Sequence, residues 1–198
     1  MGFKEMRIVR LADLSIDGKG NYGIPAPAVE YSNNLFTYLR ISDISDDGTL
    51  LKDNLKSVDS ENAGKYLLKP NDIVFARTGN STGRSYFYDK SDGELVYAGF
   101  LIKFSLDPHK INPKFMRYYT ISDKYKNWVA SFSTGSTRKN MNAKTYGDMT
   151  IELPPRHQQD FMVNILSALD KKFEVDAKIN HNLDDVRDVV ESKSEIAA

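Results

Sequence analysis

The C-terminal segment contains no residue that breaks a helix. From Arg156 to Ala198 the sequence has neither glycine nor proline, and Pro154 and Pro155 stand directly before it. Glycine and proline are the residues least compatible with a helix interior, so nothing interrupts a helix of roughly 40 residues, about 60 Å long at 1.5 Å per residue. The segment therefore predicts one long helix, with residues 155–198 forming a unit separate from residues 1–154.

This predicted helix carries a regular apolar seam. Between residues 162 and 190, positions spaced alternately by three and four residues are apolar except at Lys172 and Asp176. Such a heptad repeat is typical of helices that pair in a coiled coil. A helix folded back on its own domain is the alternative, but it needs only a few turns of such a stripe. We expect a helix–helix interface formed by Met162, Ile165, Leu169, Ile179, Leu183, Val186 and Val190.

The first 154 residues predict an α+β fold, with a mixed β-sheet and flanking helices. Apolar and β-branched runs alternate with turns rich in glycine, asparagine and aspartate, which is typical of short strands. After Asn112-Pro113 the apolar spacing changes to three and four, which predicts one or two helices up to Phe132. The predicted strands are Leu35–Ile41, Asp72–Arg77, Ser85–Tyr88, Val96–Phe104 and Thr150–Leu153.

The composition excludes several classes of protein. The chain has no cysteine, which excludes disulfides and thiolate metal sites. No run approaches the roughly 18 apolar residues that a membrane-spanning helix needs, and the N-terminus lacks the apolar core of a signal peptide. We expect a soluble protein of the cytoplasm.

Charge is divided unevenly along the chain. Residues 1–150 hold 21 basic and 17 acidic side chains, whereas residues 151–198 hold 6 and 10, although the whole chain is neutral. A basic excess in the globular part suits a polyanionic partner, because phosphate contacts require lysine and arginine. An excess of this size is also ordinary surface variation, so charge alone does not decide between the two readings.

Several stretches of the chain resemble a known family. Residues 135–142 (GSTRKNMN), Leu153-Pro154-Pro155 and Gln158-Gln159, with the helix that follows, are similar to the end of a repeat in Type I restriction-modification specificity subunits. Upstream, residues 38–48 and 65–83 are similar to the target-recognition domain of the same family. The pieces occur in the family's order and together cover nearly the whole chain.

The resemblance is to one half of such a subunit. A full specificity subunit has two recognition domains and two spacer helices, whereas this chain has room for one of each and shows no internal repeat. In the family the spacer helices pair antiparallel, hold two recognition domains along the DNA, and form the scaffold on which methyltransferase subunits dock. The resemblance thus implies double-stranded DNA, methyltransferase subunits, through them the restriction subunit, and a second copy of this chain as partners. Two inversely repeated half-sites would form the target.

No motif for catalysis is present. The chain lacks the Asn/Asp-Pro-Pro-aromatic tetrapeptide of amino-methyltransferases, since Leu153 and Arg156 flank its two prolines, and it has no glycine-rich AdoMet loop or P-loop. His109, His157 and His181 have no second histidine or cysteine three or four residues away. We expect a non-catalytic protein with no cofactor and no metal.

Three segments are candidates for contact with DNA. In the loop Arg77–Arg84, hydroxyls and an amide lie between two arginines that suit phosphate or guanine, although a polar turn between strands is an equal alternative. The second segment, Ser136–Asn140, suits contact with the DNA backbone. Alternatively, it is a structural turn that positions the start of the spacer helix. The third is Lys19–Gly23, expected to be an exposed tip. The candidate residues are Arg77, Thr78, Asn80, Ser81, Thr82 and Arg84, then Thr137, Arg138 and Lys139, and finally Lys19, Asn21 and Tyr22.

Two other readings of the chain remain open. It could be a truncated specificity chain that occupies methyltransferase subunits without directing them. It could also be the detached recognition region of a fused methyltransferase-nuclease, in which case catalytic motifs would precede it in the native reading frame.

Overall fold

The computed structural model describes residues 6–132 and 141–196, and the side chains of its last helix as far as Asn180. The chain divides into two compact units, Met1–Gln159 and Asp160–Ala198. Unit 1 contains the strands and the short helices, and unit 2 is the continuation of one long helix. The predicted α+β class is confirmed.

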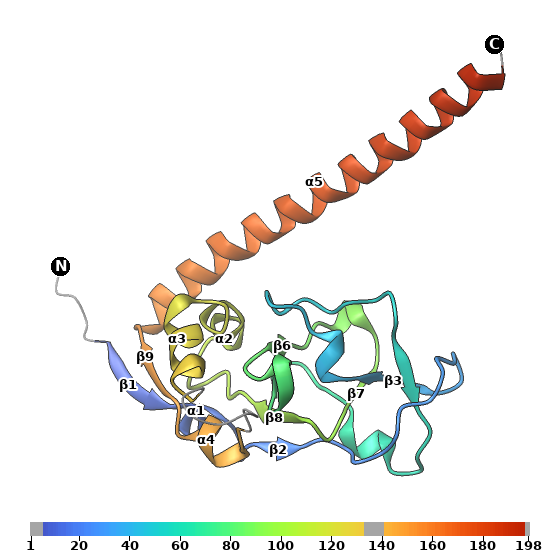
Figure 1. Ribbon diagram of the computed structural model, residues 1–198. Coiled ribbons are helices and arrows are strands. Elements are labelled where there is room, and N and C mark those ends of the chain that lie inside the picture. Colours follow the sequence, from blue (N-terminus) through green and yellow to red (C-terminus); the bar gives the residue numbers. More distant parts are fainter. Residues whose placement is uncertain (1–5, 133–140, 197–198) are drawn as a thin grey trace. The chain divides into compact units, whose positions relative to one another are not determined.

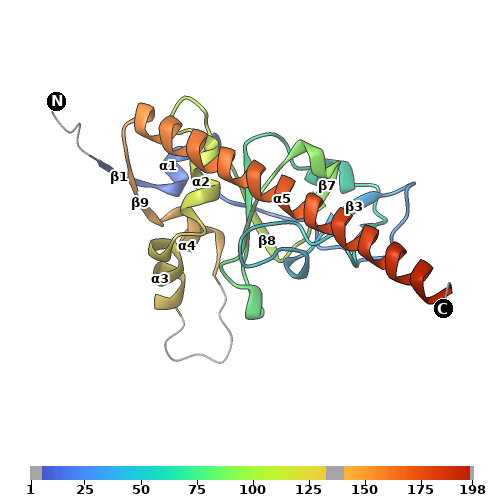
Figure 2. The same cartoon turned by 90° about the horizontal axis from the view of Figure 1, so that it is seen from above.

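Unit 1 is built from short elements. Helices α1–α4 lie at one end of it, and strands β3 and β7 lie at the other (Figures 1 and 2). The strands are β1 (Arg7–Arg10), β2 (Asn21–Tyr22), β3 (Phe36–Leu39), β4 (Lys56–Val58), β5 (Asp72–Ala76), β6 (Ser85–Phe87), β7 (Leu95–Tyr97), β8 (Leu101–Ser105) and β9 (Thr150–Leu153). The α-helices are α1 (Leu11–Leu14), α2 (Pro113–Tyr119), α3 (Asp123–Ser131), α4 (Ala143–Gly147) and α5 (Arg156–Ile196). The 3-10 turns are η1 (Ile41–Asp43), η2 (Ala63–Tyr66), η3 (Gly79–Ser81) and η4 (Lys90–Asp92).

The described strands form three small sheets rather than one. Strands β1 and β9 pair antiparallel, and β2, β8, β5 and β6 form an antiparallel sheet in that order. The third sheet has the order β4-β3-β7 and is mixed, because β3 runs antiparallel to β4 and parallel to β7.

Strand β5 is the centre of unit 1. All five of its residues are buried, and since successive side chains point to opposite faces, the strand serves two cores. Val74 and Ala76 pack among the aliphatic and tyrosine side chains of β3, β6 and β7. Phe75 faces the other way and stacks on Tyr146 of α4, with ring centroids 4.8 Å apart. This double burial fixes where the loop after β5 leaves the sheet.

The predicted single strand over Val96–Phe104 is wrong. The chain makes a turn at Ala98–Leu101, where the Leu101 N–H donates to the Ala98 carbonyl over 2.8 Å, and β7 and β8 then join different sheets. The continuous apolar run gave no sign that the chain passes from one sheet to another. Gly99 was the signal, because glycine within a strand pattern often marks a bulge or bend.

Helix α2 begins at Asn112-Pro113, as the sequence predicts, and α3 is the second of the one or two helices expected there. The Asn112 side chain accepts a hydrogen bond from the Lys114 N–H, and Pro113 occupies the first helical turn. The Ser122 hydroxyl accepts from the Tyr125 N–H at the start of α3. These caps satisfy N–H groups that a helix end otherwise leaves unpaired.

The long C-terminal helix predicted from the absence of glycine and proline is confirmed as α5, which begins at Arg156 directly after the two prolines. Within residues 6–132 and 141–196, no helix is long and apolar enough to cross a membrane.

Candidate nucleic-acid interface

Two of the predicted contact segments meet through Arg77 and Tyr22. The guanidinium carbon of Arg77 lies 5.0 Å from the centroid of the Tyr22 ring, which is a cation–π contact. Arg77 follows β5 directly, and Tyr22 ends β2 with 44% of its surface exposed. The two residues are far apart in sequence, and the four-stranded sheet brings their strands to opposite sides of β8.

The residues that follow the remaining predicted segment lie next to this contact. Thr137, Arg138 and Lys139 lie outside the described residues, but the chain that follows them is anchored beside Arg77 and Tyr22. The Met141 N–H donates to the Arg77 carbonyl over 2.8 Å, and the Ala143 N–H donates to the Tyr22 hydroxyl oxygen over 3.1 Å. Two candidate segments and the residues Met141–Ala143 therefore meet at one surface, which we call the Arg77 surface: Tyr22, Arg77 and the start of α4.

The loop after Arg77 is partly structural. Gly79 begins the turn η3 with a φ of 71°, and Gly83 has a φ of 93°, values in the left-handed region that favours glycine. A Cβ on Gly83 would lie 2.5 Å from the side chain of Val129, so α3 also requires glycine there. Thr82 is buried, and its hydroxyl donates to the Gly79 carbonyl over 2.7 Å. That hydroxyl holds the turn.

The polar groups of this loop that reach solvent are fewer than predicted. Asn80 is exposed, and Thr78 and Ser81 are partly exposed. Arg84 is bound within the chain, since its Nε donates to Asp46 over 2.7 Å and its Nη1 donates to the Ile44 carbonyl over 3.0 Å. The two arginines of the loop therefore have different surroundings. Arg84 holds the turn at Ser45–Thr49, whereas Arg77 contacts the ring of Tyr22.

Residues 19–23 form a strand edge rather than the expected free tip. Asn21 and Tyr22 pair with Lys103 and Ile102 of β8. A Cβ on Gly23 would lie 2.2 Å from the Ala98 carbonyl oxygen, so only glycine permits this close approach. Lys19 is exposed and Asn21 partly exposed, and the Asn21 amide donates weakly to Asp17 over 3.4 Å. This pairing fixes the backbone that carries the amide of Asn21 and the ring of Tyr22.

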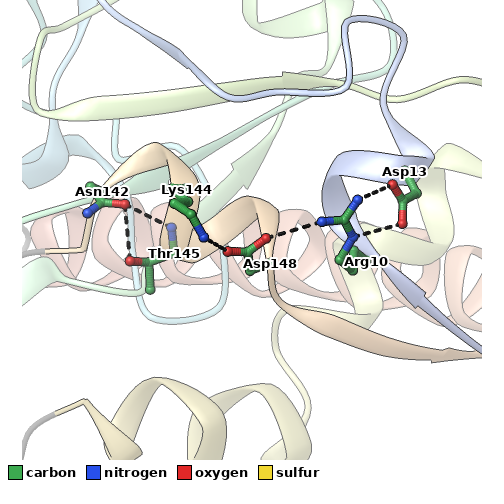
Figure 3. Close-up of polar contacts among 6 residues, drawn as sticks. All are labelled: Arg10, Asp13, Asn142, Lys144, Thr145 and Asp148. Carbon is green, nitrogen blue, oxygen red and sulfur yellow. Dashed lines mark hydrogen bonds and ion pairs between the residues drawn. The ribbon is translucent and has the colours of Figure 1, made fainter.

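Helix α4 continues the surface with a chain of charges. The Asn142 side chain caps α4 by accepting from the N–H and the hydroxyl of Thr145, over 2.8 and 3.1 Å (Figure 3). Lys144 then pairs with Asp148, which also receives a 3.4 Å contact from Arg10 (Figure 3). Arg10 is held in turn by both carboxylate oxygens of Asp13, at 2.8 and 3.0 Å.

These contacts shift the pKa of each acid in the chain of charges. The hydrogen bond from Lys144 lowers the pKa of Asp148, and the one from Arg10 lowers the pKa of Asp13. Both carboxylates stay ionised at neutral pH. A hollow of about 280 Å³ separates Lys144 from Lys19, and Arg10 and Asp148 line it as well. Three cations and one acid border this hollow, which suits a phosphate group more than a cation.

An apolar groove lies on the other side of Arg77. It has a volume of about 740 Å³ and is lined by the segment Ile24–Ala28, by Ala98–Phe100, and by Tyr38, Arg40, Ile41, Ser42 and Arg77. Phe100 is 59% exposed at its edge. The sequence analysis missed Phe100 because it placed this residue inside a strand. Lys144 was also missed, since a single lysine carries no signal in sequence.

The described residues of unit 1 and of α5 contain no cluster of three or more histidine, aspartate or glutamate side chains that could hold a metal ion. His109 and His157 are exposed.

Residues 4–184 match the Type I restriction modification DNA specificity domain. The chain belongs to this family. The match includes β1 to β9, the Arg77 surface and most of α5, so the resemblance predicted from short motifs is confirmed over nearly the whole chain.

Relatives in the Type I specificity family are longer than this chain. The Type I restriction enzyme StySPI specificity subunit of Salmonella potsdam is 27% identical over 144 residues, which are 70% of this chain and 31% of that protein. The HsdS subunit of Thermoanaerobacter tengcongensis has the same fold, with a TM-score of 0.61 and 17% identity over 89% of this chain and 44% of its own. The Type I S subunit of M. genitalium gives a TM-score of 0.57 and 16% identity over 94% and 44%. The chain thus spans less than half the length of each of these relatives.

Helix α5 exposes the described part of the predicted seam. Met162, Ile165, Leu169 and Ile179 have between 42% and 50% of their surface exposed. Leu183, Val186 and Val190 lie on the described helix, but their side chains are outside the described residues. Phe161 and Phe173 are also exposed, at 65% and 68%, and widen the apolar face of the helix.

Proposed function

We propose that this chain recognises DNA sequence for a Type I restriction-modification complex. Residues 1–154 act as the target-recognition domain and residues 155–198 as the spacer helix. The observation that supports this best is that Tyr22 and Arg77, from two separately predicted DNA-contact segments, lie in contact beside the start of α4 in a chain of the Type I specificity family. Phosphate contacts by the cations and base contacts by Arg77 then place the duplex against β2, the loop after β5 and the start of α4.

Catalysis in this proposal comes from partner subunits. The sequence holds no methyltransferase or nuclease motif, so methyltransferase subunits, and through them the restriction subunit, supply methyl transfer and cleavage in the cytoplasm. The chain itself uses no cofactor. Its contribution is to choose the site on the DNA at which those subunits act.

A second copy of the chain completes the proposed unit. The exposed side chains of Met162, Ile165, Leu169 and Ile179 form an apolar edge on α5 that gains stability when another helix covers it. Pairing by two-fold symmetry would present two identical recognition domains to the duplex. The target is then an inverted repeat of two half-sites separated by an unrecognised gap.

Methylation mapping tests this proposal. The chain is co-expressed with its neighbouring methyltransferase subunits, and modified positions in the host DNA are then sequenced. A symmetric motif with a central gap is expected, and Arg77→Ala should alter or abolish it. A chain that co-purifies with the methyltransferase but directs no methylation supports the truncated, non-productive alternative. Catalytic motifs upstream in the native reading frame support the fused-enzyme alternative.

The gap length provides a second test. Seven residues inserted into α5 preserve the heptad seam and lengthen the helix by about 10 Å, roughly three base pairs of duplex. The gap between half-sites should grow by that amount while the half-sites stay the same. An unchanged gap would show that α5 does not set the spacing.

A further inference from the structure

Phe100 stands at the surface in a fixed position. It lies in the turn between β7 and β8, and 59% of the surface of this residue is exposed. A single exposed aromatic ring is common on proteins and indicates nothing by itself. The arrangement of Phe100 relative to Arg77 and the apolar groove is what gives this ring a role.

Phe100 and Arg77 are cross-strand neighbours. Strands β5 and β8 pair antiparallel up to Ala76 and Leu101, and the Arg77 N–H donates to the Phe100 carbonyl over 3.0 Å, which extends the same register by one pair. Residues directly opposite in an antiparallel pair have side chains on the same face, with Cβ atoms about 4.5–5.5 Å apart. Arg77 and Phe100 also line the same groove, so the two side chains border one surface.

The surface next to Phe100 is apolar. The groove is lined there by Pro25, Ala26 and Pro27 and by Ala98. Two prolines fix the backbone of that wall, and they have no N–H group to donate. A ligand placed over Phe100 thus meets apolar atoms, whereas one placed over Arg77 meets N–H donors.

Of the four bases, thymine alone presents a methyl group to the major groove. Its 5-methyl packs well against phenylalanine or alanine, whereas adenine and cytosine present an amino donor that an apolar surface leaves unpaired. The commonest partner of an arginine on a base edge is guanine, through O6 and N7. Stacking of Arg77 on Tyr22 uses the face of the guanidinium and guanine binding uses its edge, so the two contacts are compatible.

We propose that Phe100 is a specificity-determining residue whose ring contacts the 5-methyl group of a thymine beside the guanine that Arg77 binds. This inference deepens the proposed function and depends on it. Each half-site then contains adjacent guanine and thymine positions, and a change of Phe100 alters the preference at the thymine alone.

Uracil substitution provides the test, because uracil differs from thymine only by the missing methyl group. The complex of the chain with its methyltransferase subunits first selects its preferred sites from random duplexes. Each thymine of the selected site is then replaced by uracil, one at a time, and binding of wild type, Phe100→Ala and Phe100→Leu is measured. Phe100 is exposed, so thermal melting should show all three proteins equally folded.

We expect the effect of removing one thymine methyl group to depend on the presence of the Phe100 ring. Uracil at one position should weaken wild-type binding about three- to five-fold, the effect of losing one buried methyl group. Phe100→Ala should bind thymine and uracil at that position equally, whereas Phe100→Leu should keep a preference for thymine. Arg77→Lys should change the neighbouring position instead.

Three outcomes would overturn the inference. One is a selected site in which no uracil substitution matters. Another is a Phe100→Ala protein that still prefers thymine over uracil. The third is a loss on Phe100→Ala that is equal for all sequences, which indicates a wedge or a backbone contact. A wild-type complex that prefers no sequence would instead contradict the proposed function, and this inference would fail with it.

Discussion

The guanidinium of Arg77 lies over the ring of Tyr22, and the backbone of Arg77 is hydrogen bonded on both sides, to Phe100 and to Met141. A cation–π contact contributes about 0.5–1 kcal/mol at exposed sites and about 2 kcal/mol when water is excluded. The side chain of Arg77 is thus held near one orientation before DNA arrives. A residue fixed in this way loses less conformational entropy when it binds a base.

Replacing Arg77 tests whether this orientation serves base recognition. Arg77→Ala should weaken binding to the preferred site by about 1–3 kcal/mol, and the loss of preference should be confined to one base position. Tyr22→Phe keeps the ring under the guanidinium and serves as the matched control for Tyr22→Ala, which removes it. Binding of each variant to a panel of single-base site variants is the measurement. An equal loss of affinity for all sequences would indicate that Arg77 contacts a phosphate rather than a base.

Arg84 should matter for stability more than for DNA. Only 29% of its side chain is exposed, and it donates to the carbonyl of Ile44 as well as to Asp46. Arg84→Ala leaves that carbonyl without its charged donor and should lower the free energy of unfolding by about 1 kcal/mol. Asp46→Ala is the control, because Asp46 is 86% exposed and its ion pair contributes little. Urea unfolding measures both, and a stable Arg84→Ala protein with weakened DNA binding would contradict this assignment.

Lys144 should contribute to the salt dependence of binding. Its side chain is 85% exposed and pairs with Asp148, and such an exposed pair is worth little, so exchanging the carboxylate for a phosphate costs little. Lys144→Gln should reduce the slope of log affinity against log salt by about one, with sequence preference unchanged. Lys178→Gln is the matched control, since Lys178 also pairs with an acid four residues away, but on α5. Equal slopes for Lys144→Gln and wild type would exclude a phosphate contact.

Local signals in the sequence predicted the elements that depend on local chemistry. The absence of glycine and proline after Pro155 gave α5, and Asn112-Pro113 gave the start of α2. The division of the run Val96–Phe104 between two sheets was not predictable from its apolar pattern, because a continuous strand and two strands joined by a turn have the same composition.

The site was predictable only as separate segments. Arg77 and Tyr22 were each candidates, but their contact depends on β2 and β5 pairing with the same strand, which is a long-range property. The roles of Thr82 and Arg84 inside the loop were hidden for the same reason. A hydroxyl that holds its own turn and one that faces DNA look alike in sequence, and burial alone separates them.

Buried tyrosines should make the fold sensitive to alkali. Tyr125 and Tyr146 are buried and donate to the carbonyls of Gly83 and Ala76, each over 2.7 Å. Burial raises the pKa of both hydroxyls above their ordinary value near 10. Their contribution to stability is complete below pH 10 and is lost as the pH rises above it, because the unfolded chain ionises first. Each tyrosine should lower the free energy of unfolding by about 1.4 kcal/mol per pH unit there.

A titration followed by ultraviolet absorbance and circular dichroism measures this effect. Tyrosinate absorbance from the buried rings should rise together with the loss of helix, not before it. Tyr146→Phe should lower the free energy of unfolding by about 1 kcal/mol at neutral pH and reduce its dependence on pH above 10. Ionisation of the buried tyrosines in a protein that remains folded would contradict the assigned burial.

Leu169 provides the most direct test of self-association through α5. It lies on the predicted seam and is 44% exposed, so an aspartate there leaves the fold of unit 1 untouched while placing a charge in any helix–helix interface. Leu169→Asp should convert a dimer of twice the 22.4 kDa chain mass into a monomer in sedimentation, and should abolish methylation of paired half-sites. Asn164→Asp adds the same charge at an exposed position off the seam and should leave the dimer intact. If the wild-type chain sediments as a monomer, or if both variants remain dimers, α5 does not pair with its own copy.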